Sequence, residues 1–120
     1  MTGQTLTNSL SGEGYAVEFH PEQDCVRMSG ALRLGGLAEY GPISAMLEDA
    51  LNGRERLVLD LSELEFLNSS GIATLSKFVI LARNHGDCAL VICGSRDIAW
   101  QGKSLNNLKR LMPALELRFE

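Results

Sequence analysis

The arrangement of apolar residues between Leu57 and Leu111 limits the possible folds more than any other feature of the sequence. Two nearly continuous apolar runs, Leu57–Leu61 and Ala89–Cys93, are each followed by a segment in which apolar residues recur at the helical period. Such runs are typical of strands that are covered on at least one face. Strand–helix–strand alternation predicts right-handed crossovers between parallel strands. The chain is therefore expected to form an α/β domain.

Shorter alternating segments on both sides of this centre extend the expected sheet. Tyr15–His20 and Cys25–Ser29 alternate apolar and polar residues around a turn at 21–24, which predicts an antiparallel hairpin. Leu115–Phe119 alternates in the same way and is expected to form an edge strand. These segments together predict a mixed sheet of four to five strands with helices mainly on one face.

Three segments carry the apolar spacing of helices. The first helix is expected to begin near Leu37 or near Pro42, since proline is tolerated in a first turn. The third is expected to follow an irregular loop over 94–102 that carries Trp100 as an anchor over the core. The expected apolar stripe of the first helix is Ile43, Met46, Leu47, Ala50 and Leu51. That of the second helix is Ile72, Leu75, Val79 and Ala82, with Phe78 beside it. That of the third helix is Leu105, Leu108 and Leu111. Leu59, Leu75 and Val91 are expected to be almost fully buried.

Composition indicates one ordinary globular domain. The chain has 120 residues, of which 45% are hydrophobic and 22% charged, and its net charge is -4. A mildly acidic chain with scattered basic residues does not favour nucleic-acid binding. No apolar run is long enough for membrane insertion, and the start of the chain lacks the pattern of a secretory signal. Residues 1–14, rich in Thr, Ser, Asn and Gly, are expected to be a flexible leader before a domain over 15–120.

The three cysteines have no metal-binding spacing. Cys25, Cys88 and Cys93 include no C-x-x-C pair, and with two histidines they are too few for a closed zinc site. Reduced thiols in a cytoplasmic protein are the expectation, with no metal and no cofactor.

Two catalytic patterns are incomplete. The serine-hydrolase elbow G-x-S-x-G lacks its first glycine at Leu67–Gly71, and only His20 and His85 are available as bases. A phosphate-binding loop would end in Gly102-Lys103-Ser104, but Asp97 occupies the position of its first glycine. The expected interpretation there is a helix start capped by Ser104. We therefore expect no enzyme activity and no tight nucleotide binding.

The turn Asn68-Ser69-Ser70-Gly71 is the remaining functional candidate. Asn and Ser are strong N-cap residues, so Asn68 or Ser69 is expected to cap the second helix. A helix N-terminus also presents free N–H groups and a positive dipole end that tolerate a phosphoryl group. Ser69 is therefore a candidate phosphorylation switch. Asp60, which follows the central apolar run, is either a solvated strand residue or a helper at this turn.

The segments Leu57-Val58-Leu59-Asp60-Leu61-Ser62 and Leu67–Leu75 resemble STAS domains, the anti-sigma factor antagonist family. That family has a buried V-L-D-L-S-type strand, a short linker and D-S-S/T-G-(L/I) opening a helix. Gly30-Ala31-Leu32 is similar to the family's G-E-L-D turn. The resemblance extends over roughly residues 15–119 and implies the STAS fold and a regulatory protein-interaction role.

The resemblance also implies partners. In the family, the serine at the position of Ser69 is phosphorylated by a serine kinase or anti-sigma factor of the histidine-kinase-like ATPase fold, and a PP2C-type phosphatase reverses the modification. The implied partner-binding residues are Arg33, Asn68, Ser69, Ser70 and Gly71. Asn68 and Arg33 replace acidic residues of the family pattern, and Arg33 is a candidate partner for a phosphate.

Two other functions remain open at the level of sequence. One is an unphosphorylated STAS adaptor within a larger signalling or lipid-transport complex, which would bind its partner with Ser or Ala at 69. The other is a small nucleotide-binding protein. The sequence does not identify the partner or the oligomeric state.

Overall fold

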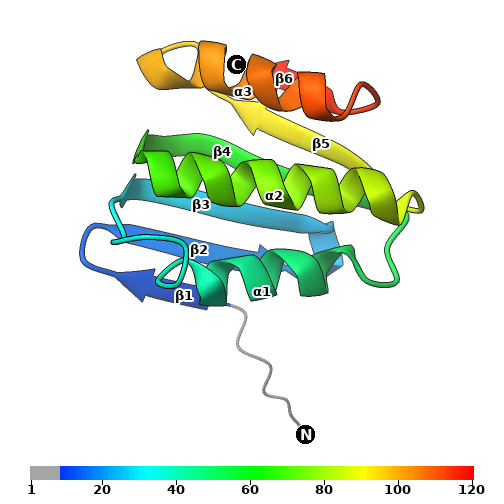
Figure 1. Ribbon diagram of the computed structural model, residues 1–120, viewed down its shortest axis with the longest axis horizontal. Helices are drawn as coiled ribbons and strands as arrows, with labels where there is room; N and C mark the ends of the chain where they lie inside the picture. The colour runs from blue at the N-terminus through cyan, green and yellow to red at the C-terminus, as the bar shows by residue number, and fades with distance from the viewer. Residues whose placement is uncertain (1–8) are drawn as a thin grey trace, which may run out of the picture.

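The computed structural model describes residues 9–120, which form a six-stranded mixed sheet and three α-helices (Figure 1). The elements in chain order are β1 (Ser9–Gly12), β2 (Tyr15–His20), β3 (Cys25–Leu32), α1 (Gly41–Leu51), β4 (Arg56–Leu67), α2 (Ser69–His85), β5 (Ala89–Gly94), α3 (Ala99–Leu111) and β6 (Glu116–Phe119); a 3-10 turn, η1 (Pro21–Gln23), lies between β2 and β3.

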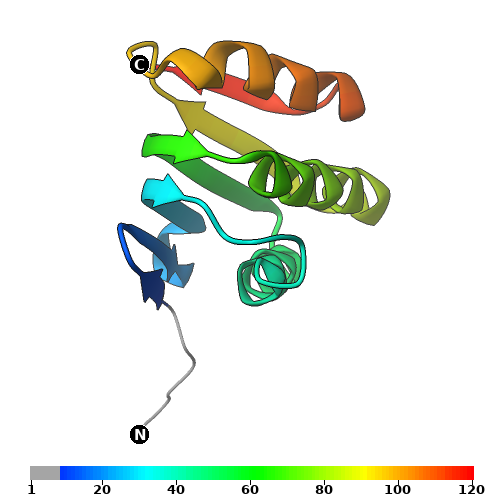
Figure 2. The same cartoon turned by 60° about the vertical axis from the view of Figure 1, so that its left-hand side comes forward.

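The strands lie in the sheet in the order in which they occur in the chain. β1–β2 and β2–β3 are antiparallel, whereas β3–β4, β4–β5 and β5–β6 are parallel. Each parallel step is made by one helix, as the strand–helix alternation predicts. Because right-handed crossovers that advance in one direction place their helices on one side, all three helices cover the same face of the sheet (Figure 2).

The core lies between the sheet and this helix layer. Leu59 on β4 and Leu75 on α2 have 0% and 2% of their surface exposed, as expected. Val91 is also buried, at 3%, although it lies on the opposite face in register with Val58 and Glu116. The three expected helical stripes face the core, except that Ile72 and Leu111 are only partly buried.

The sheet begins earlier than expected. Residues 1–8 lie outside the described residues, but Ser9–Gly12, which the sequence assigns to a leader, form β1 and pair with β2. A tight turn with Gly14 at φ +81° allows this pairing. β1 contains one apolar residue, Leu10, so its alternation is too weak to predict a strand, and the sheet has six strands instead of four or five.

β4 is longer than its apolar run. The sequence predicts that residues 62–67 link the central strand to the Asn68 turn, but they continue the strand to Leu67. The buried residues Leu61, Leu64 and Leu67 in this part of β4 are spaced by three. Two shifts of register against β3, between Arg27 and Ser29 and between Gly30 and Ala31, let residues with this spacing face the same side. A period of three matches neither a regular strand nor a helix, which is why the sequence predicts a linker.

The third helix also begins earlier than predicted. α3 starts at Ala99, so Trp100 belongs to its first turn and not to a loop, and Ser104 is an interior residue rather than a cap. No helix among residues 9–120 is both long enough and apolar enough to cross a membrane.

Candidate functional site

Asn68 joins the end of β4 to the start of α2. Its backbone is extended (φ -78°, ψ 176°), and its Oδ1 accepts a hydrogen bond from the Gly71 N–H at 3.0 Å. Its own N–H donates to the Leu32 carbonyl of β3. Asn68 is therefore the N-cap of α2, one of the two residues that the sequence offers for this role, and it aligns the helix with the ends of two parallel strands.

The same side chain also holds the loop between β3 and α1. Tyr40 Oη donates to Asn68 Oδ1 at 2.6 Å, and Asn68 Nδ2 donates to the Leu34 carbonyl at 2.8 Å. An aspartate could accept the first of these bonds but could not donate the second while ionised. The bond to the Leu34 carbonyl therefore explains structurally why an asparagine stands at position 68, where the family pattern has an acidic residue.

Gly71 is required by the same packing. A Cβ atom at this position would overlap Leu67 Cδ1 and lie 2.8 Å from the Tyr40 hydroxyl oxygen. The residue is buried, and φ is not positive, so space and not backbone conformation excludes a side chain. Gly71 therefore acts by permitting close contact between α2, β4 and Tyr40.

Ser69 and Ser70 differ in their surroundings. Ser69 is the first residue of α2 and is exposed, and its hydroxyl makes no hydrogen bond to any other described residue. Ser70 is partly buried, and its carbonyl accepts the Thr74 hydroxyl at 2.8 Å. The first N–H groups of a helix lack intrahelical acceptors. Because the N–H groups of Asn68 and Gly71 are bonded, the free donors beside the Ser69 hydroxyl are the N–H groups of Ser69 and Ser70. Of these two serines, Ser69 is the accessible one.

Arg33 directly follows β3, at the start of the loop that Asn68 holds. Its guanidinium carbon is 4.8 Å from the centroid of the Phe66 ring, a cation–π contact, and it forms no ion pair with a described residue. Phe66 is 39% exposed and lies two residues before Asn68. The turn is thus bordered by an exposed aromatic ring covered by a cation.

The two histidines do not reach Ser69. His20 pairs with Cys25 at the start of β3, and that residue pairs with Val58 near the start of β4, whereas Ser69 follows the end of β4. His85 is the last residue of α2, about 24 Å from Ser69 along the helix axis. Neither histidine is therefore placed to act as a base for Ser69.

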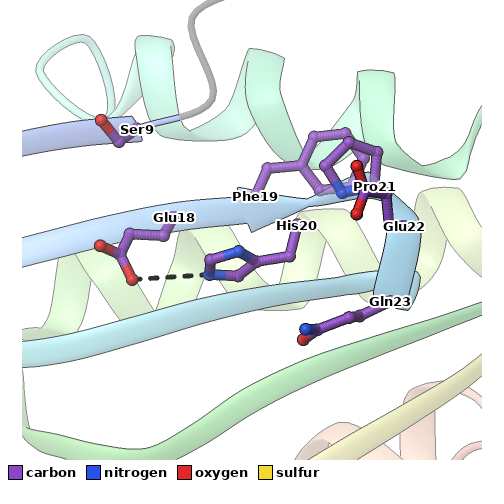
Figure 3. Close-up of a pocket in the computed structure, with 7 residues that line it drawn as sticks. All are labelled: Ser9, Glu18, Phe19, His20, Pro21, Glu22 and Gln23. Carbon is purple, nitrogen blue, oxygen red and sulfur yellow. Dashed lines mark ion pairs between the residues drawn. The ribbon is translucent and has the colours of Figure 1, made fainter.

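His20 lines a hollow of about 420 Å³ (Figure 3). His20 Nε2 lies 3.6 Å from a Glu18 carboxylate oxygen. The other lining residues are Ser9, Phe19, Pro21, Glu22 and Gln23. Most of these side chains belong to β2 and the turn after it, at the end of the sheet opposite Ser69. The sequence did not single out this hollow.

The incomplete phosphate loop is not a loop in the structure. Gly102, Lys103 and Ser104 lie inside α3, so their N–H groups belong to helical hydrogen bonds and cannot surround a phosphate. The start of α3 has a different role. Buried Gln101 donates to the Leu61 and Leu64 carbonyls, at 2.7 and 3.0 Å, and accepts from the Ser95 N–H. Gln101 thus supplies hydrogen-bond donors to β4 carbonyls that lie beyond the part of β4 paired with β5.

Asp60 lies on the face of the sheet that the helices leave open. Its carboxylate accepts from the Ser62 N–H and hydroxyl and lies 3.4 Å from Arg27 Nε. It is a strand residue that stabilises the irregularity of β4, not a helper at the Ser69 turn. Burial, with the Asp60 charge, raises the pKa of Cys25 and Cys93, and burial raises that of Cys88. All three cysteines are free thiols.

Three solved structures with a similar fold involve the protein SiaC. A chain in the crystal structure of diguanylate cyclase SiaD in complex with its activator SiaC from Pseudomonas aeruginosa superposes with a TM-score of 0.72 at 18% identity, covering 93% of this chain and 98% of that one. SiaC alone gives 0.66 at 20% identity, with 92% of each chain covered, and apo-SiaC gives 0.70 at 16%, covering 93% and 98%. These similarities establish a shared fold.

Sequence comparison gives the family. No curated protein sequence matches the chain significantly. The family model of the STAS domain matches residues 17–99, more than half of the chain, and includes β4, the Asn68 turn and α2. The chain belongs to the STAS domain family.

Proposed function

We propose that this chain is a regulatory protein-interaction module whose docking surface surrounds Arg33 and the Asn68–Gly71 turn, and that phosphorylation of Ser69 switches its binding. The observation that carries the proposal is the contrast within the turn. Asn68 and Gly71 are fixed by hydrogen bonds and packing, while the Ser69 hydroxyl is exposed and has no hydrogen-bond partner among the described residues.

The chemistry of the turn is compatible with a phosphoryl group. The free N–H groups and the positive end of the dipole of α2 favour an anion at Ser69, so modification should leave the fold intact. Phosphate adds about -1.5 to -2 charge at neutral pH. Burying that charge against a partner without a matching cation would cost several kcal/mol, so the modified chain should release its partner.

The proposed partners follow from the family and from the structural neighbours. A kinase of the histidine-kinase-like ATPase fold would modify Ser69, and a PP2C-type phosphatase would restore it. The neighbour SiaC is described as the activator of a diguanylate cyclase with which it forms a complex. We propose that the unmodified chain likewise docks on a signalling enzyme, in the cytoplasm, and alters its activity.

A second candidate is an adaptor that is not phosphorylated. Two observations favour it: Asn68 is fully used in structural hydrogen bonds, and the Arg33 guanidinium is stacked on Phe66. In that case the same surface would bind a partner permanently.

One experiment separates the two candidates. The chain is recovered from its native cells, its intact mass is measured, and any phosphate is located by peptide sequencing; bound proteins are identified in the same sample. Phosphate on Ser69 in part of the population, with the partner bound to the unmodified part, supports the switch. Unmodified chain under all growth conditions, with Ser69→Ala and Ser69→Asp binding the partner alike, would assign the adaptor function instead.

A further inference from the structure

A continuous groove runs between α1 and α2 on the outer side of the helix layer. One hollow, of about 490 Å³, is lined by Leu37, Gly41, Ser44, Ala45, Glu48, Lys77, Phe78 and Leu81. A second, of about 370 Å³, is lined by Glu48, Asp49, Leu51, Asn52, Leu81, Asn84 and His85. They share Glu48 and Leu81, so they form one feature, called here the α1–α2 groove. The two helices lie side by side in both views (Figures 1 and 2).

Exposed apolar side chains concentrate at this groove. Three large hydrophobic residues are exposed within residues 9–120, and two of them, Leu37 at 46% and Leu81 at 39%, line it. The third, Phe66, lies under Arg33 beside the Ser69 turn. Two exposed apolar side chains that line one hollow make it a candidate for contact with another molecule.

The side of the groove that α1 forms, called here the α1 wall, carries small residues that allow an occupant to approach the helix closely. Gly41, Ser44 and Ala45 are small residues three or four positions apart on α1, and they line the same hollow as Phe78 of α2. From Gly41 to Asn52 this wall extends about 16 Å. A ligand helix with apolar residues at i, i+4, i+7 and i+11 has the same length along its axis, so the groove fits three helical turns.

The rims of the groove carry opposite charges. Glu48 and Asp49 lie on the α1 side and Lys77 lies on the α2 side, and none of the three forms an ion pair with a described residue. These charges are therefore free to pair with an occupant. A helix with basic residues on the flank over α1 matches the two carboxylates.

The size of the groove favours a single helix as its occupant over a second folded copy of the chain. The lining comprises thirteen residues across the two hollows, of which Glu48 and Leu81 are shared. A stable interface between globular proteins involves about 20–30 residues on each side. A single amphipathic helix needs fewer contacts because its apolar stripe inserts between two helices.

We infer that the α1–α2 groove binds an amphipathic helix of the partner protein, with its apolar stripe between α1 and α2 and its basic flank over Glu48 and Asp49. This inference rests on the proposed function, since it specifies how the docked partner is held. Leu37 lines the groove and lies in the loop that is bonded to the Ser69 turn through Asn68 with Tyr40 and Leu34.

The test uses two synthetic peptides of about 18 residues, each locked as a helix by a hydrocarbon staple on its outward side. Both carry leucines at i, i+4, i+7 and i+11; one has arginines on the flank over α1 and the other has glutamates there. Fluorescence anisotropy measures their affinity for the wild-type chain. The arginine peptide should bind about two- to fivefold more tightly than the glutamate peptide, as expected for exposed charge pairs.

Matched variants locate the binding. Ala45→Arg places a long charged side chain in the groove at an exposed position and should weaken the arginine peptide roughly tenfold or more. Asn107→Arg adds the same charge at an exposed position of α3, outside the groove, and should bind like wild type. Glu48→Lys should reverse the preference between the two peptides. Circular dichroism checks that each variant is folded.

Several outcomes would overturn the inference: no binding of either peptide at about 500 µM, equal binding by wild type and Ala45→Arg, or an unchanged preference in Glu48→Lys. A chain that sediments as a dimer and becomes monomeric in Ala45→Arg would assign the groove to a second copy. With the native partner, loss of affinity in Ala45→Arg but not in Ser69→Asp would support the groove and contradict the switch. The opposite result would retain the switch and reject the groove.

Discussion

Tyr40 Oη lies 2.6 Å from Asn68 Oδ1 and donates a hydrogen bond to it, joining the residue before α1 to the cap of α2. Through this bond and the one from Asn68 to Leu34, the loop after β3 and the Ser69 turn form one rigid surface. The docking surface and the α1–α2 groove both depend on that junction. The following predictions test its parts.

Asn68→Asp should destabilise the fold, although aspartate is the residue typical of the family. The variant loses the bond to Leu34 and leaves a carbonyl unpaired, which costs about 1–3 kcal/mol, whereas a negative charge at the start of α2 returns about 0.3–1 kcal/mol. The free energy of unfolding should therefore fall by about 1 kcal/mol at neutral pH. At pH values low enough to protonate the aspartate, its hydroxyl can donate and the difference should narrow. Chemical denaturation at both pH values measures this, and equal stability at neutral pH would contradict the role of the amide.

Gly71→Ala should destabilise the fold by about 1–3 kcal/mol, because the added methyl group overlaps Leu67 and crowds Tyr40. Gly102→Ala is the control. Gly102 is exposed inside α3, and a Cβ atom added there would meet no other atom within 4 Å, so alanine should stabilise the fold by about 0.5–1 kcal/mol. Thermal unfolding of both variants should thus give opposite shifts of Tm. A stabilising Gly71→Ala would show that the contact between α2 and β4 is looser than described.

Gln101→Leu should be strongly destabilising. The variant is similar in size but leaves the Leu61 carbonyl and the Ser95 N–H without their partner, while the Leu64 carbonyl keeps only its bond from the Trp100 indole N–H, so it should cost roughly 3 kcal/mol. Gln23→Leu, at an exposed position, should change the free energy of unfolding by less than about 0.5 kcal/mol. Urea denaturation compares the two, and similar stabilities would mean that β4 does not need α3 to complete its hydrogen bonds.

The pH dependence of the stability of Tyr40→Phe tests the bond between Tyr40 and Asn68. Burial raises the pKa of the Tyr40 hydroxyl, so the stability that its neutral form contributes is fully present below the ordinary tyrosine pKa of about 10 and is lost as pH rises through the folded-state pKa. At pH 8 the variant should be about 1 kcal/mol less stable than wild type because it lacks the bond to Asn68. At alkaline pH the difference should shrink, since only wild type must ionise this buried group. A difference that is independent of pH would contradict a buried, hydrogen-bonded hydroxyl.

Sequence patterns predicted the parts of the fold that follow regular periods. The hairpin of β2 and β3, the central strand with Leu59 and the stripe of α2 are confirmed, because burial on one face imposes alternation or a 3.6-residue repeat. β1 and the second half of β4 were missed for the opposite reason. A polar edge strand needs little apolar surface, and bulges in β4 change the spacing of its buried residues.

The site was predictable only in part. Local sequence narrowed the cap of α2 to Asn68 or Ser69, and Ser69 lies outside the apolar stripe expected for that helix. The bonds from Tyr40 and to Leu34 join residues 28 and 34 positions apart, so no local pattern reveals them. The same is true of the groove, which needs the relative placement of two helices. Trp100 and Gln101 were assigned to a loop because no side chain caps α3.

The affinity of the co-purified partner for chain carrying phosphoserine at position 69, compared with the unmodified chain, tests the central claim most directly. Phosphoserine is introduced during translation so that the population is homogeneous, and titration calorimetry gives both Kd values; circular dichroism shows whether the fold is retained. The account predicts an unchanged fold and a Kd that rises about a hundredfold or more, the equivalent of burying an unmatched charge. Equal Kd values for the two forms would contradict a docking surface that includes Ser69.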